Sequence, residues 1–229
     1  MTRSRIRNFL FRKRPRLRGQ SLVEFTILLP LLLLMISGLI EFGFMLNYYL
    51  DLIDAAREAA RWGAGDDPVH CDPTNPAPCV PASPPNPWTD YNSHFYDRVC
   101  AVANDSIDIG SGGQITLDST ADDITVSAFS VSGGVVTARF PPPAYGGANG
   151  FSCMNPGGLG NHGSQFTNAQ INAMLNPAAP ATGVVLVEMW YDYHMILGLP
   201  WISLFVPDPV TLYAYSIMPN VNVEATPTP

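Results

Sequence analysis

The chain has 229 residues, enough for one domain of ordinary size and a membrane anchor, and its net charge of −7 hides a strong asymmetry. Eight of its twelve basic residues lie in the first eighteen positions, whereas from Gln20 onward four basic residues face nineteen acidic ones, a side-chain charge of −15. The basic run could be a nucleic-acid-binding arm, but it leads directly into an apolar segment. We therefore expect no nucleic-acid partner and a cytoplasmic N-terminus.

The apolar segment that follows the basic leader (residues 1–19) predicts a membrane helix. It has no charge between Phe25 and Ile40 and stays mostly apolar to Leu50, and a spanning helix needs about 20 such residues. Glu24 and Glu41, about 25 Å apart along a helix, would lie close to opposite membrane interfaces. No convincing signal-peptide cleavage site follows, so we expect a single-pass protein of the cytoplasmic membrane with an extracytoplasmic C-terminal domain.

Helical spacing continues beyond the membrane, and we expect one helix over residues 20–62. Ala55, Ala56, Ala59 and Ala60 are strong helix formers whose small side chains would let another helix approach closely. Acid–base pairs at i,i+3 suit the exposed face, and Gly63 is a C-cap signal. Residues 63–87 then hold eight prolines in twenty-five positions, which indicates a linker.

Residues 88–224 predict an α+β domain with a small antiparallel sheet, followed by a tail at 225–229. We expect helices at 88–107 and 168–175, and strands at 114–118, 123–129, 135–140, 184–193 and 210–217. The strand at 184–193 places one set of side chains on one face, with Glu188 and Asp192 on the other: Val185, Val187, Met189, Tyr191 and Tyr193.

Residues 196–206 are mostly apolar but too short for a second span. They either pack in the core, the reading we favour, or form an exposed contact patch.

Four cysteines lie on the predicted outer side, where an even number favours two disulfides: Cys71, Cys79, Cys100 and Cys153. Three pairings are possible, and the favoured one joins Cys71 to Cys79 and Cys100 to Cys153. A metal site is disfavoured because the chain has no CxxC pair and its histidines are scattered. We expect no metal and no cofactor.

Motifs of catalysis are weak in this chain. Residues 158–163 spell GxGxxG, but no confident strand precedes them and the next acidic residue is badly spaced, so a loop is the better interpretation. The pairs Asp122–Asp123 and Asp66–Asp67 could hold calcium weakly, yet turn acids on a solvated surface are commoner. We expect a protein that is not an enzyme.

The junction at Gly19 is more informative. An acidic residue in the centre of a membrane helix costs about 2.5–3.5 kcal/mol, so Glu24 needs a partner. Cleavage after Gly19 would give Gln20 a free α-amine one helical turn from Glu24. That amine, or the amine of a neighbouring subunit, would neutralise the carboxylate.

Several stretches together resemble the TadE-like family of the tight-adherence (Tad) system: Arg18-Gly19-Gln20-Ser21-Leu22-Val23-Glu24-Phe25, Leu28-Leu29-Pro30, Ile40-Glu41-Phe42-Gly43 and Ala55-Ala56-Arg57-Glu58-Ala59-Ala60-Arg61. The resemblance implies a pilin-like fold and a pseudopilin that takes part in assembly of a Flp-type pilus or its secretion machine. It assigns cleavage by a prepilin peptidase to Gly19, the mature N-terminus to Gln20, and the assembly motif to Glu24 and Phe25.

The resemblance also implies the partners: the peptidase, the Tad platform membrane proteins, other pilins and the lipid bilayer. The alternative is a membrane-anchored binding module, adhesin-like or TadG-like, that keeps its N-terminus.

Overall fold

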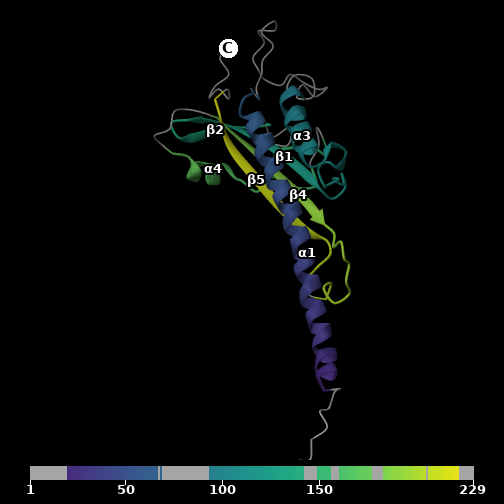
Figure 1. Ribbon diagram of the computed structural model, residues 1–229. Helices are drawn as coiled ribbons and strands as arrows, with labels where there is room; N and C mark the ends of the chain where they lie inside the picture. The colour runs from purple at the N-terminus through teal and green to yellow at the C-terminus, as the bar shows by residue number, and fades with distance from the viewer. Residues whose placement is uncertain are drawn as a thin grey trace, which may run out of the picture. The chain divides into compact units, whose positions relative to one another are not determined.

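The computed structural model describes residues 20–66, 68, 93–141, 149–155, 160–176, 183–204 and 206–221 (Figure 1). The chain forms two compact units, residues 1–40 and residues 41–229. Helix α1 (Gln20–Gly63) supplies the described part of the first unit and the beginning of the second.

The first unit is an apolar helical segment with little burial. Only 6% of the most apolar eighteen-residue window of α1 is buried. A helix that is apolar on all sides and unburied in its own chain suits lipid. Within the described residues, α1 is the one helix long and apolar enough to cross a membrane, which fits a single-pass membrane protein. The predicted long N-terminal helix is confirmed.

The second unit contains an antiparallel sheet, which confirms the α+β class. Its strands pair in the order β2-β1-β4-β5, and β3 pairs with β1: β1 (Asp123–Ser132), β2 (Val135–Phe140), β3 (Phe151–Ser152), β4 (Gly183–Tyr193) and β5 (Val210–Asn220). Gly133 and Gly134 join β1 to β2 with φ of 61° and 76°, a left-handed pair that matches strand twist in tight hairpins. Sequence reasoning missed only the short β3 among these strands.

One face of the sheet packs against the C-terminal part of α1 and against α3 (Ser93–Ile107). The four alanines of α1 are at most 1% exposed and share a core cluster with Val185, Val187 and Met189 of β4. A Cβ on Gly63 would lie 3.1 Å from Val99 and 3.3 Å from Val185, so the end of the helix is also closely packed. The four alanines therefore pack within this chain's own core, which also contains side chains of α3.

The opposite face of the sheet is covered as well. Helix α4 (Asn168–Met174) begins with a capping box between Thr167 and Gln170 and buries Ile171. Ile171 belongs to a second apolar cluster with Phe129 and Leu186. Glu188 is buried on this side, where it accepts hydrogen bonds from the Gln165 N–H at 2.8 Å and the Tyr213 hydroxyl at 2.7 Å. Two covered faces explain why β4 is apolar almost throughout.

The prediction of a strand at 114–118 is wrong. Only an isolated bridge between Asp108 and Ile115 forms there, because the Ile115 N–H donates to the Ile107 carbonyl at 2.9 Å and its side chain is buried at the end of α3. Asp118 closes a turn by accepting the Thr120 N–H at 2.8 Å. The apolar residues of this segment therefore fill the core without joining the sheet. The helix predicted at 88–107 is observed from Ser93, and residues 88–92 lie outside the described part.

The predicted disulfide between Cys100 and Cys153 is present, with the two Cα atoms 5.5 Å apart. It joins α3 to the segment after β3 and closes a loop of 53 residues. Cys71 and Cys79, like most of the proposed linker, fall in ranges that the structure does not describe.

Replacing Cys100 and Cys153 by alanine should lower the free energy of unfolding by about 4 kcal/mol, because a loop of this length is constrained in the unfolded chain. Thermal unfolding of the full chain in detergent micelles, followed by near-ultraviolet circular dichroism, measures the loss. Cys100→Ala alone should cost as much as the double replacement, since either removes the same bond. A double replacement that costs clearly more free energy than Cys100→Ala alone would contradict the pairing.

Candidate functional site

The proposed processing site lies at the beginning of α1. Gly19 and the basic leader lie outside the described residues, while Gln20 is the first residue of the helix. Glu24 and Phe25 are both exposed, Phe25 to 61%, on the first turns of α1. The structure therefore presents the two motif residues on the helix surface, one turn after the backbone of Gln20.

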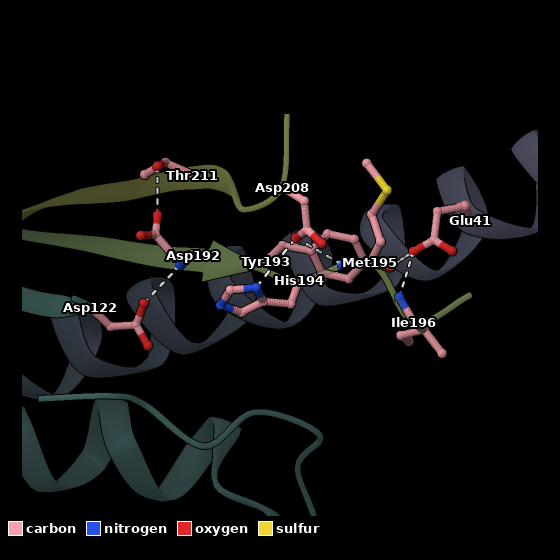
Figure 2. Close-up of polar contacts among 9 residues, drawn as sticks. All are labelled: Glu41, Asp122, Asp192, Tyr193, His194, Met195, Ile196, Asp208 and Thr211. Atoms are coloured by element: carbon pink, nitrogen blue, oxygen red, sulfur yellow. Dashed lines mark hydrogen bonds and ion pairs between the residues drawn. The ribbon is translucent and has the colours of Figure 1, made fainter. Parts of the chain in front are cut away.

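Glu41, in the middle of α1, has a different environment. Its side chain is only 6% exposed, and its carboxylate accepts three hydrogen bonds. Figure 2 shows Glu41 with two of the donor residues, Tyr193 and Ile196. Oε1 accepts the Tyr193 hydroxyl at 2.6 Å and the Ile196 N–H at 2.8 Å, and Oε2 accepts the Leu197 N–H at 2.9 Å. We call this group of four residues the Glu41 junction. It ties α1 to the end of β4 and to the chain that follows it.

Tyr193 is held in place for this contact. It is the last residue of β4, pairs with Val210 of β5, and packs its ring edge-on against Tyr48 of α1 with centroids 5.3 Å apart. Burial, followed by the hydrogen bond to Glu41, raises the pKa of Tyr193 well above its usual value. The phenol therefore remains a donor at any physiological pH. Sequence analysis treated Glu41 as an interfacial acid and missed this role, although a carboxylate in an apolar run was the available signal.

We call residues 195–207 the apolar loop; its residues Ile196 and Leu197 also belong to the Glu41 junction. At its neck, Oδ1 of Asp208 accepts the Met195 N–H and approaches His194 Nδ1, both at 3.3 Å (Figure 2). The loop also has internal backbone bonds, from the Ile202 N–H to the Leu199 carbonyl at 2.9 Å and from the Val206 N–H to the Ile202 carbonyl at 3.1 Å.

Much of the described part of the apolar loop is exposed. Several of its side chains are exposed by more than a third: Ile196, Leu197, Trp201, Leu204 and Val206. The favoured expectation of core packing is therefore wrong, and the exposed patch is what the structure shows. The reason is that the loop begins beyond the last pair of the β4–β5 ladder and is attached to α1 through backbone N–H groups, which leaves several of its side chains exposed.

The acids considered for catalysis or calcium are structural acceptors. Asp122 accepts the N–H groups of Asp118 and Asp192, each at 2.7 Å, and Asp123 accepts the Ser152 hydroxyl at 2.7 Å and the His162 N–H at 3.2 Å. Both are buried, so their assignment as solvated turn acids is wrong. Burial raises the pKa of Asp122.

The described part of the GxGxxG segment, residues 160–163, packs onto these acids. A Cβ on Gly160 would collide with the side chains of Asp123 and Ser152. Glycine is thus required for close packing on β1. The other acid pair is only half described: Asp66 accepts the Asn220 side-chain amide through its backbone carbonyl at 2.8 Å, and Asp67 is not described.

Comparison with known proteins agrees with the resemblance noted in the sequence. Residues 19–61 match the family described as TadE-like protein. No curated protein and no solved structure is significantly similar to the chain. The match begins at Gly19, covers α1 from Gln20 to Arg61, with Glu24 and Phe25, and stops before the sheet. It indicates a Tad pilus-associated protein with one candidate membrane helix.

Glu41→Ala should lower the free energy of unfolding by about 2–4 kcal/mol, because a buried hydroxyl and two backbone N–H groups lose their acceptor. Amide hydrogen exchange of the full chain in micelles should show faster exchange at Ile196 and Leu197. Tyr193→Phe removes only one donor and should cost about 1 kcal/mol with both amides still protected. Unchanged exchange in Glu41→Ala would contradict the junction.

Proposed function

We propose that the protein is a TadE-like minor pseudopilin that takes part in assembly of a Flp-type pilus or its secretion machine. The observation that carries the proposal is the family match, which begins at Gly19 and follows α1 to Arg61. The role is structural and not enzymatic. Its partners are a prepilin peptidase, the Tad platform membrane proteins, other pilins and the bilayer.

Processing supplies the chemistry of this proposal. Hydrolysis of the peptide bond between Gly19 and Gln20 on the cytoplasmic side releases the basic leader and leaves an α-amine at Gln20. Four residues of helix separate that amine from Glu24, about 6 Å along the axis. An ammonium at that distance lowers the cost of a carboxylate at the edge of the lipid. In an assembled row of subunits, the α-ammonium of one chain can pair with the Glu24 carboxylate of the next.

Contacts between subunits would come from the N-terminal half of α1. The alanine face of the second half is occupied by the sheet and α3 of the same chain. The first half of α1 instead has exposed apolar side chains, which include Leu28, Leu31, Leu32, Met35 and Leu39. The Cys100–Cys153 disulfide supports an oxidising location for the folded domain, outside the cytoplasm.

Mass spectrometry of the N-terminus tests the processing step on protein extracted from membranes of the native host. The mature chain should begin at Gln20, and Gly19→Ala should retain the leader on most molecules. Ser21→Ala, a matched change on the other side of the bond, should be processed normally. An intact Met1 in the unaltered protein would instead support the membrane-anchored binding module.

Glu24→Ala tests the role of the carboxylate. Cleavage should persist, because the bond after Gly19 is unchanged, but co-purification of a differently tagged second copy should fall about tenfold, the equivalent of one charged hydrogen bond. Thr26→Ala is the control: the Thr26 hydroxyl bonds to its own helix at the Leu22 carbonyl, 2.8 Å away. Equal recovery of the second copy with Glu24→Ala and with the unaltered protein would refute the pairing.

A further inference from the structure

The apolar loop is unusual for a surface facing water. Residues 195–207 contain no charged side chain, and Leu204 is 79%, Ile196 50% and Trp201 41% exposed. Grouped apolar exposure of this kind marks a contact surface. His194 and Asp208 flank the loop at its two ends, so ionisable side chains occur only there.

The attachment of the loop indicates its depth relative to the membrane. Its first residues, Ile196 and Leu197, are bonded through their backbone to Glu41. Glu41 directly follows the uncharged run 25–40. That run rises about 24 Å, whereas the hydrocarbon core is about 30 Å thick, so a span that starts at Phe25 ends near residue 44. Phe42 and Phe44 are accordingly still exposed, by 54% and 39%.

We propose that the apolar loop inserts into the outer interface of the lipid bilayer, beside the point where α1 leaves it. The proposal requires that α1 spans the membrane, but it does not depend on the role in pilus assembly. Trp201 has the side chain that is enriched at such interfaces. Internal backbone bonds within 199–206 reduce the number of N–H and C=O groups that would face lipid unsatisfied.

The same arrangement explains the Glu41 junction. A carboxylate at the edge of the hydrocarbon is costly unless it is hydrogen-bonded. The loop supplies two of its three donors and Tyr193 supplies the third. The loop thus donates hydrogen bonds to the Glu41 carboxylate, while several of its own apolar side chains are exposed.

Lipid is favoured over a protein partner because the loop is continuous with the span through Glu41 and carries no charge that would select a complementary surface. For the same reason, binding should not require anionic lipid. Zwitterionic phosphatidylcholine vesicles should be sufficient.

The test uses the full chain reconstituted in phosphatidylcholine vesicles whose acyl chains carry bromine close to the headgroup, which quenches tryptophan fluorescence on contact. Part of the emission should be quenched, and Trp201→Phe should remove at least half of the quenched part. Trp62→Phe is the matched control, because Trp62 lies about 31 Å further along α1 than Glu41. It should leave the quenched part unchanged.

A second variant separates insertion from folding. Leu204 is the most exposed side chain of the loop, so Leu204→Asp should preserve the fold and reduce the quenching of Trp201 about twofold or more. Quenching that Trp201→Phe leaves undiminished would overturn the proposal. A second result would also overturn the proposal: blue-shifted Trp201 emission that bromine does not quench and that shifts to the red as the lipid-to-protein ratio rises. That result would show that a second copy of the chain covers the loop.

Carbonate extraction of the vesicles distinguishes the two possible failures. A chain that is released by carbonate does not span the membrane, which contradicts the anchor and the loop together. A chain that remains with an unquenched Trp201 contradicts only the loop. Neither result bears on cleavage after Gly19, which the N-terminal mass measures independently.

Discussion

The buried carboxylate of Glu41 is the interaction on which the arrangement of the second unit depends. It joins three elements that are far apart in sequence: the middle of α1, the last residue of β4, and the apolar loop. The second compact unit of the chain begins at this residue. A helix with one charged side chain in an apolar stretch can be attached at only one register, because a shift by one turn would leave both the acid and its donors unsatisfied.

Helix α1 consequently has two surfaces of different character. Up to Ile40 its apolar side chains are exposed, which suits lipid and neighbouring subunits. From Leu52 onward its small residues are buried against the sheet of the same chain. The family match follows the helix and stops before the sheet.

Acidic side chains in this domain act mainly as acceptors for backbone N–H groups. Asp122, Asp123 and Glu188 are buried, and each accepts at least one such bond from irregular backbone, at Asp118, His162 and Gln165 respectively. An acceptor of this kind fixes irregular backbone that cannot pair with a strand.

Much of this protein follows from local sequence. The uncharged run 25–40, the alanines before Gly63 and the β-branched runs of β1, β4 and β5 indicate their elements because hydrophobic periodicity and propensity act over a few residues. The family pattern at Gly19 to Phe25 is equally local. Four cysteines allowed three pairings, and proximity of α3 to the end of β3 in the folded chain decided that Cys100 bonds to Cys153. Tertiary structure alone decided that Glu41 is a buried acceptor, that Ile115 is buried at the end of α3 instead of forming a strand, and that Ile196, Trp201 and Leu204 are exposed. Each of these outcomes depends on a partner from a distant part of the chain, and periodicity contains no information about which distant groups will meet.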